Sequence, residues 1–322
     1  MRYSALAELP PPPLGKTGWP WTCESQRLPA TMPDGLPWPK VSIVTPSYKQ
    51  GQFIEETIRS VLLQSYPDLE YIIIDGGSTD CSVDVIKSYE PWLSYWVSEP
   101  DLGQANAINK GFALCRGDIV AWLNSDDTYT PNAIQTVVQH ILSHACNVIY
   151  GNCNLMDETG AVSGVIVPPR VTFDSLIRFW VRNSIPPQPA IFFRRRVLDE
   201  IGPLDESLRY AMDYDLWLRM AENHSFDHIN AVLGNYRLHS DSKTVSESTD
   251  FRPEWHRVSQ KYRRVENLQY QLSFWTACGL YKLNILKSLI WGVIKKYSWL
   301  KPLENFILKI VGRQYERVAR GR

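Results

Sequence analysis

Short apolar runs and amphipathic stretches alternate along the first half of the chain. The apolar runs have the length and composition of buried β-strands, and they lie at residues 41–45, 69–74, 95–97, 118–123 and 147–150. Between the first two runs, apolar residues recur at helical spacing at Ile54, Ile58, Val61 and Leu62. Strands that alternate with helices in this way predict an α/β fold with a doubly wound, mixed but mainly parallel sheet flanked by helices.

The pattern is less regular on either side of this region. Residues 1–40 include four consecutive prolines and show no helical or strand period, so we expect an extended N-terminal arm. Beyond residue 151 we expect a strand at 190–193 and helices at 195–201 and 213–221. The chain therefore divides into an arm (1–40), an α/β domain (41–250) and a C-terminal tail (251–322).

Charge is distributed unevenly, although the whole chain has a net charge of zero. Residues 255–322 contain 14 Lys and Arg residues against three Glu residues, a net charge of +11. A basic tail indicates an anionic partner, which could be a membrane surface or a nucleic acid. The apolar residues between Leu283 and Ile294 lie among lysines, which is typical of an amphipathic helix on an anionic membrane. The alternative is a helical appendage that packs on the domain and has a basic outer face.

Three features of the sequence concern location. The six cysteines form no Cys-x-x-Cys pair, so neither a zinc site nor a disulfide framework is expected, and a reducing cytoplasm is the simplest compartment. The N-terminal residues show no signal-peptide pattern. No apolar run reaches the roughly 18 to 20 residues that span a bilayer. We therefore expect a cytoplasmic protein, with the tail as a possible peripheral contact to the inner face of the cell membrane.

Acidic residues follow the second and fourth apolar runs and open the last predicted helix. Asp75 closes the second run, Asp126 and Asp127 close the fourth, and Asp213 begins the helix. In doubly wound sheets, ligands bind beyond the carboxyl ends of the strands. Hard divalent cations take carboxylate and phosphate oxygens as ligands, so Asp126 and Asp127 predict a metal site for a nucleoside diphosphate. Asp213 is then a candidate general base; the alternative for any single carboxylate is a solvated residue or a helix cap.

Four motifs follow one another along the domain. They are VSIVTPSY (41–48), IIIDGGSTD (72–80), DIVAWLNSDD (118–127) and DYDLWLR (213–219). With these motifs, residues 41–243 resemble the family 2 inverting glycosyltransferases of GT-A fold. The resemblance implies that a sugar is transferred from a nucleoside diphosphate sugar to an acceptor hydroxyl, with a divalent metal (Mn²⁺ or Mg²⁺) as cofactor.

The resemblance also assigns residues to the nucleotide-sugar site. Thr45, Pro46 and Tyr48 match the first-strand segment that lines the nucleotide base pocket. Asp75 matches the first acid of the second-strand motif, and Gln104 lies in a run that resembles a donor-site loop. A UDP-sugar is the expected donor.

The metal and catalytic roles fall on the later motifs. Asp126 and Asp127 match the DxD-type motif that binds metal and diphosphate, with Asp127 the preferred direct ligand, and Asp213 matches the catalytic base. A polar cluster after the last predicted strand is expected to fold over the donor, and its candidates near the diphosphate or metal are His239, Arg237 and Lys243. We take His239 as a candidate metal ligand, and the alternative for the whole cluster is a solvated loop.

Four positions depart from the family pattern. Gly76 stands where a second acid commonly contacts the base, which removes one expected contact and leaves the carrier nucleotide open. Lys49 replaces a usual Asn, Met212 precedes the base where Glu is common, and Asn106 stands where an acid is frequent. None of these changes removes the metal acids or the base.

The expected activity is transfer of a single sugar to a glycan or lipid-linked acceptor in the synthesis of cell-surface polysaccharide or glycolipid. No Gln-x-x-Arg-Trp motif of processive synthases follows Asp213. No nucleic acid is expected as a partner. One alternative is a catalytically silent protein that binds sugar nucleotides or acts as a scaffold. Another is a nucleotidyltransferase, which should have a Gly-rich basic loop after the first strand, and Ser47–Gly51 matches that loop poorly.

Overall fold

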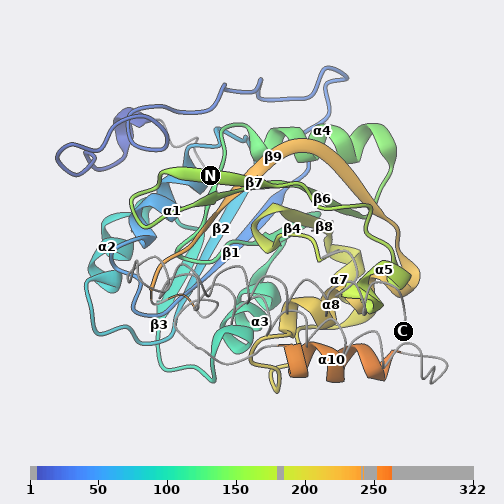
Figure 1. The fold of residues 1–322 in the computed structure, drawn as a ribbon. Helices are drawn as coiled ribbons and strands as arrows, with labels where there is room; N and C mark the ends of the chain where they lie inside the picture. Colours follow the sequence, from blue (N-terminus) through green and yellow to red (C-terminus); the bar gives the residue numbers. More distant parts are fainter. Residues whose placement is uncertain (1–5, 180–184, 241, 243–251, 263–322) are drawn as a thin grey trace, which may run out of the picture. The chain divides into compact units, whose positions relative to one another are not determined.

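A mixed sheet of nine strands forms the centre of the part of the protein that the computed structural model describes, namely residues 6–179, 185–240, 242 and 252–262 (Figure 1). The strands lie in the order β3-β2-β1-β4-β8-β6-β9-β5, and β7 pairs with β6. Alternating strands and helices, with helices flanking a mixed sheet, confirm the predicted fold class.

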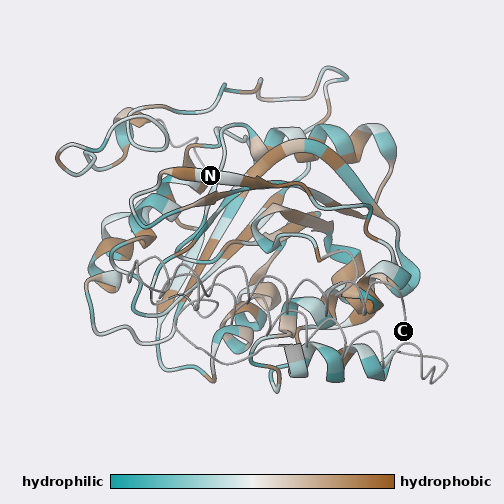
Figure 2. Cartoon of the chain, viewed as in Figure 1, coloured by the Kyte–Doolittle hydropathy of each residue, from teal (hydrophilic) through white to brown (hydrophobic). Residues whose placement is uncertain are grey.

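One half of the sheet is parallel and contains the first predicted strands. They are β1 (Val41–Ser47), β2 (Leu69–Asp75), β3 (Tyr95–Ser98) and β4 (Ile119–Trp122). Strand β1 pairs in parallel with both β2 and β4, and all residues of β1 and β4 are buried, which explains the continuous apolar run of β4 and the many apolar residues of β1 (Figure 2). Because Ser47 is in register with Asp75, the carboxyl ends of β1 and β2 meet at one edge of the sheet, as predicted.

The other half is mainly antiparallel, and three of its strands were not predicted. Its members are β5 (Thr128–Tyr129), β6 (Val148–Met156), β7 (Val162–Ile166), β8 (Ile191–Arg194) and β9 (Phe226–Arg237). Strand β8 is antiparallel to β4 and β6, whereas β9 is parallel to β6. Arg237, which we expected beyond the last strand, is the final residue of β9. The polar cluster therefore begins inside the sheet.

Helices cover both faces of the parallel half. On one face, Ile43 packs in a core cluster with residues of α1 (Ile54–Leu62) and α4 (Ala133–His144). On the other, α3 (Gln104–Leu114) approaches so closely that a Cβ at its Gly111 would lie 2.3 Å from the Val44 side chain. The remaining helical segments are η1 (Leu6–Glu8), α2 (Ser82–Ser88), η2 (Glu90–Trp92), α5 (Phe173–Ile177), η3 (Gln188–Ala190), α7 (Arg195–Ile201), α8 (Met212–Asn223) and α10 (Arg252–Lys261).

The described residues of the N-terminal arm pack on the domain. Arg59 of α1 is fully buried and donates hydrogen bonds to the backbone carbonyls of Pro10, Pro20 and Trp21 at 2.8 to 3.1 Å. Trp38 also belongs to the main core cluster. A buried guanidinium needs acceptors, so these carbonyls hold the arm in place.

Helix α10 lies at the start of the expected tail and packs on α8 (Figure 1). Residues up to Tyr262 group into one compact unit, so these first tail residues join the domain. The amphipathic segment predicted between Leu283 and Ile294 lies outside the described residues, and its membrane contact stays a prediction. Among the residues that the structure describes, no helix is long and apolar enough to cross a bilayer.

Candidate active site

The acidic turn after β4, Asn124–Asp127, is the centre of the candidate site. Its two carboxylates point in different directions. The Asp126 Oδ2 atom lies 2.9 Å from Nε2 of His239, which follows β9. Asp127 is buried, with 1% of its surface exposed, and its Oδ1 accepts a hydrogen bond from the Arg237 backbone N–H at 2.9 Å. Asp126 therefore faces a second candidate metal ligand, while Asp127 faces the backbone of β9.

His239 is held firmly beside this turn. It is 3% exposed, and its ring lies 4.6 Å from the Phe53 ring, centroid to centroid. Its Nδ1 is buried and finds no hydrogen-bond partner among the described residues. Carboxylate oxygens are ligands that suit Mn²⁺ and Mg²⁺, and imidazole nitrogens are common ligands of divalent transition metals. The residues present therefore fit the predicted cofactor.

The environment of Asp127 differs from that of Asp126. Burial raises the pKa of Asp127 well above its usual value, and the neighbouring Asp126 charge raises it further. The Arg237 N–H and the Asn124 amide oppose this shift by hydrogen bonding to the charged form. The Thr57 hydroxyl lies 2.7 Å from the Asp127 carbonyl oxygen and fixes the same turn. Asp127 thus fastens the turn to α1 and β9.

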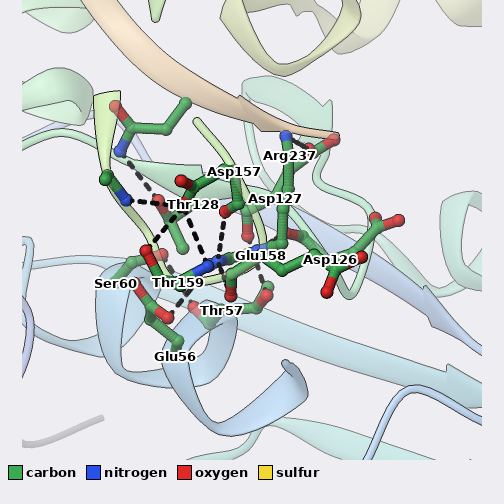
Figure 3. Close-up of polar contacts among 12 residues, drawn as sticks. Glu56, Thr57, Ser60, Asp126, Asp127, Thr128, Asp157, Glu158, Thr159 and Arg237 are labelled. Atoms are coloured by element: carbon green, nitrogen blue, oxygen red, sulfur yellow. Dashed lines mark hydrogen bonds and ion pairs between the residues drawn. The ribbon is translucent and has the colours of Figure 1, made fainter. Parts of the chain in front are cut away.

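Arg237 connects the turn to two other parts of the protein, the loop after β6 and helix α1 (Figure 3). Its Nε donates to the Asp126 carbonyl at 2.8 Å, and its Nη1 donates to the carbonyls of Asp157 and Glu158 at 3.2 Å. Its Nη2 forms an ion pair with Glu56 of α1 at 3.0 Å. The side chain is 1% exposed, so Arg237 supports the acidic turn from within and does not face a diphosphate. Lys243, the other basic candidate, lies outside the described residues.

A chain of amides extends from the turn to α3 and η3. Gln104, the first residue of α3, donates from Nε2 to the Asn124 Oδ1 at 2.8 Å. Asn124 donates in turn to the Gln188 Oε1 at 3.1 Å. The structure therefore brings Gln104 next to the acidic turn, and its role at the donor stays a prediction. Gln188 was not predicted, because only the fold brings it to the end of β4.

The carboxylate of Asp75 is used inside its own loop. Its oxygens accept hydrogen bonds from the backbone N–H groups of Gly77 and Ser78 and from the hydroxyls of Ser78 and Ser98, at 2.6 to 3.1 Å. The side chain is fully buried. In this conformation Asp75 shapes the loop after β2 and has no surface for direct contact with a base.

The loop after β1 is tied to the loop after β2. Lys49 donates its backbone N–H to the Ser78 hydroxyl at 2.8 Å, and Gly51 donates to the Asp80 carboxylate at 2.9 Å. Tyr48 is 56% exposed, whereas the Thr45 hydroxyl is buried 3.0 Å from the Tyr71 hydroxyl. Pro46 is also buried. Of the residues predicted at the base pocket, Tyr48 is the exposed one, and Thr45, Pro46 and Asp75 lie beneath the loops.

A carboxylate occupies the space beside Gly76. A Cβ built at Gly76 would lie 2.6 Å from Oδ2 of Asp101, so no side chain fits there without moving Asp101. The other Asp101 oxygen accepts the Gly103 N–H at 2.7 Å, just before α3 begins. An acid from another loop therefore lies where the family's second acid would start. From the sequence we could see that Gly76 replaces an acid. We could not see that Asp101 lies beside it, because the two residues are 25 positions apart.

Asp213 is the second residue of α8 and is half-buried. One helical turn further on, the Trp217 ring stacks on Trp122 of β4, with centroids 5.2 Å apart. Residues i and i+4 share a helix face. Asp213 therefore lies on the face of α8 that meets the end of β4. Strand β4 ends at Trp122, two residues before the acidic turn begins at Asn124.

Comparison with known proteins accords with this geometry. The model of the family described as Glycosyl transferase family 2 matches residues 42–202, half of the chain. The chain belongs to glycosyl transferase family 2. This glycosyltransferase is 30% identical to an uncharacterised glycosyltransferase of Rickettsia typhi over 65% of the chain, and it spans 66% of that relative. It is 27% identical to TuaG of Bacillus subtilis, a putative teichuronic acid biosynthesis glycosyltransferase, over 74% of the chain and 92% of TuaG.

Solved structures share the fold. S. aureus TarS in complex with UDP-GlcNAc superposes with a TM-score of 0.56 at 16% identity, covering 74% of the chain and 72% of TarS. The mannosyltransferase PcManGT of Pyrobaculum calidifontis, in complex with GDP-Man and Mn²⁺, gives a TM-score of 0.50 at 17% identity, covering 84% and 83%. At these identities the likeness shows the GT-A-like fold alone.

Proposed function

We propose that this family 2 glycosyltransferase transfers one sugar from a nucleoside diphosphate sugar to an acceptor hydroxyl, with inversion at the anomeric carbon. The observation that carries the proposal is the contact between Asp126 and His239, 2.9 Å apart at the end of β4. Two candidate ligands from distant parts of the chain lie side by side there. A silent binding protein would not need such a pair together with a carboxylate at the start of α8.

The metal would be held by Asp126 and His239. When bound, it neutralises the charge of the diphosphate, which helps the nucleotide to leave. The sequence favoured Asp127 as the direct ligand, and the geometry supports the opposite order. One Asp127 oxygen is bound to the Arg237 N–H, and the side chain is 1% exposed. We therefore assign Asp126 to the metal and Asp127 to the support of the turn.

Asp213 would act as the general base. In the proposed reaction the carboxylate takes the proton of the acceptor hydroxyl, and the acceptor oxygen forms a bond to the anomeric carbon. The bond from that carbon to the diphosphate oxygen breaks, and the nucleoside diphosphate leaves with the electron pair. A single displacement inverts the anomeric centre and needs no nucleophile from the protein.

The donor and acceptor are proposed from the relatives and the chemistry. TarS binds UDP-GlcNAc and PcManGT binds GDP-Man with Mn²⁺, which supports a nucleoside diphosphate sugar here. We propose a UDP-sugar as donor. TuaG, named for teichuronic acid synthesis, supports a glycan or lipid-linked acceptor in cell-surface polysaccharide assembly.

The carrier can be identified by a thermal-shift screen of UDP, GDP and dTDP with Mn²⁺ or Mg²⁺. Binding to the folded state stabilises by mass action, by about 2.7 kcal/mol at 100 times the dissociation constant. We expect UDP with Mn²⁺ to give the largest shift and transfer from a UDP-sugar to follow. A failure of every nucleoside diphosphate sugar to bind or react would refute the proposal.

Site variants then separate the roles. Asp126→Ala should abolish the metal-dependent part of the UDP shift, because it removes one of two proposed ligands. Asp213→Asn should leave that shift intact and lower transfer by at least about 10²-fold, since it removes the base. Asp84→Asn, which changes an exposed acid of α2, is the matched control and should behave as wild type. Full activity of Asp213→Asn would exclude it as the base.

A further inference from the structure

The helix that carries the proposed base begins without a side-chain cap of its own. Its N-cap residue is Ala211, which makes no side-chain hydrogen bond. Alanine is a poor N-cap because it has no acceptor for the free N–H groups at a helix start. The nearest acid of the helix, Asp213, accepts the N–H of Tyr214 at 2.7 Å. The three backbone N–H groups just before the helix, those of Arg209, Tyr210 and Ala211, find their acceptors on another element.

Glu254 of α10 supplies these acceptors. Its Oε1 accepts the backbone N–H of Arg209 at 3.2 Å, and its Oε2 accepts those of Tyr210 and Ala211 at 2.6 and 2.8 Å. Hydrogen bonds to a charged carboxylate are stronger than neutral ones. A negative charge beside the N-terminus of a helix is also favourable, because the helix dipole is positive there.

Trp255 of α10 and Tyr262, which follows the helix, also contact this part of the protein. The Trp255 indole N–H donates to the Tyr210 carbonyl at 3.0 Å, and the Trp255 ring stacks on Tyr214 with centroids 5.5 Å apart. At the end of α10, the Tyr262 hydroxyl donates to the Asp215 carboxylate at 2.9 Å. Contacts from α10 therefore reach residues on both sides of Asp213.

We propose that Glu254 is a positioning residue for the base Asp213. It binds the three N–H groups that precede α8 and so sets where the first turn of the helix, with Asp213, lies relative to the acceptor hydroxyl. This inference rests on the role proposed for Asp213. A displacement of about 1 Å at a reacting group can lower the rate about 10²-fold. Glu254 contacts the segment before α8 and not the acidic turn, so the donor and the metal should bind without it.

Steady-state kinetics test this proposal, with the UDP-sugar from which wild type transfers as the donor. In Glu254→Ala, kcat should fall at least about 10-fold, while the KM for the donor and the UDP–Mn²⁺ affinity stay within about twofold. Glu254→Gln keeps one acceptor oxygen, so its kcat should lie between those of wild type and Glu254→Ala. Trp255→Phe, which loses the indole N–H but keeps an aromatic ring, should also lower kcat, and it serves if Glu254→Ala folds poorly.

Glu200→Ala is the matched control. Glu200 of α7 pairs at 2.9 Å with His224, the residue that ends α8, so this variant removes a carboxylate that contacts the far end of the same helix and leaves its start untouched. We expect its kcat to equal that of wild type. Wild-type kcat in Glu254→Ala, or an equal loss of kcat and nucleotide affinity, would overturn the proposal.

Hydrogen exchange separates this proposal from the proposed function. In Glu254→Ala the amides of Arg209, Tyr210 and Ala211 should exchange at least about 10-fold faster, because their acceptor is gone. This measurement needs no donor and no turnover. Unchanged exchange would refute the Glu254 contacts even in an active enzyme. If wild type is inactive but the three amides exchange faster in Glu254→Ala, the proposed reaction is refuted and the Glu254 contacts are supported.

Discussion

Replacement of Arg237 by Met would test whether a buried guanidinium holds the acidic turn. Met keeps an unbranched apolar stem beside Phe53, whose ring centre lies 4.8 Å from the guanidinium carbon. It removes the ion pair with Glu56 and the hydrogen bonds to three carbonyls. Glu56 would then keep its charge with only 15% of its side chain exposed.

The expected loss is large for a single substitution. Breaking a buried ion pair by removing one partner typically costs about 3–5 kcal/mol, because the other charge is left buried without a partner. Two of the three carbonyls, those of Asp157 and Glu158, belong to exposed residues and can hydrogen bond to water instead, so they add little. We therefore expect Arg237→Met to lower the free energy of unfolding by about 3–5 kcal/mol, against a total of about 5–15 kcal/mol for a typical domain.

Urea unfolding of four proteins measures this effect: wild type, Arg237→Met, Glu56→Met and the double variant. Replacing both partners by apolar side chains of similar length removes the uncompensated charge. The double variant should therefore be more stable than the sum of the single effects predicts, by at least about 1 kcal/mol. Additive effects, or a loss below about 1 kcal/mol in Arg237→Met, would show that the guanidinium does not hold the turn. The UDP–Mn²⁺ thermal shift should also shrink in Arg237→Met.

Two further predictions concern the base pocket and the thiols. Asp101→Ala should weaken UDP binding about 10-fold, or about 1.4 kcal/mol, and Gly76→Ala should do the same because its Cβ would lie 2.6 Å from the Asp101 carboxylate; unchanged affinity by calorimetry would contradict both. At pH 8, iodoacetamide should modify the exposed Cys23 and Cys81 and spare Cys115. Burial, with the nearby Glu70 charge, raises the pKa of Cys115 to about 12, so its reactive thiolate is scarce, and mass spectrometry of labelled peptides would detect any exception.

Strands β1, β2 and β4 of the parallel half could be predicted because they are buried on both faces. All residues of β4 are buried, and such a strand appears in the sequence as an unbroken apolar run. Strand β9 could not be predicted in the same way. Its buried and exposed positions do not alternate regularly, and its pairing with β6 shifts register on either side of Asn152. A strand of this kind is specified by its neighbours and not by a local period.

In the candidate site too, features set by neighbouring residues could be predicted, and contacts between residues far apart in the sequence could not. The sequence placed Asp126 and Asp127 together at a strand end, which the structure confirms. It could not show which carboxylate turns inward. That choice depends on the backbone N–H of Arg237, 110 residues away, and an N–H group is present in every residue except proline. Side-chain patterns in one sequence contain no signal for such a partner.

The positions of these supporting groups bear on how the proposed enzyme works. The family match ends at residue 202, and it includes the loops after β1, β2 and β4. Both His239 and Asp213 lie beyond it, as do Arg237 and Glu254, which hold the acidic turn and the start of α8. In our proposal the matched segment binds the donor, while the later segment completes the metal site and places the base. Transfer would then require β9 to be paired in the sheet and α8 and α10 to be packed in place, whereas nucleotide recognition at the β1 and β2 loops would not.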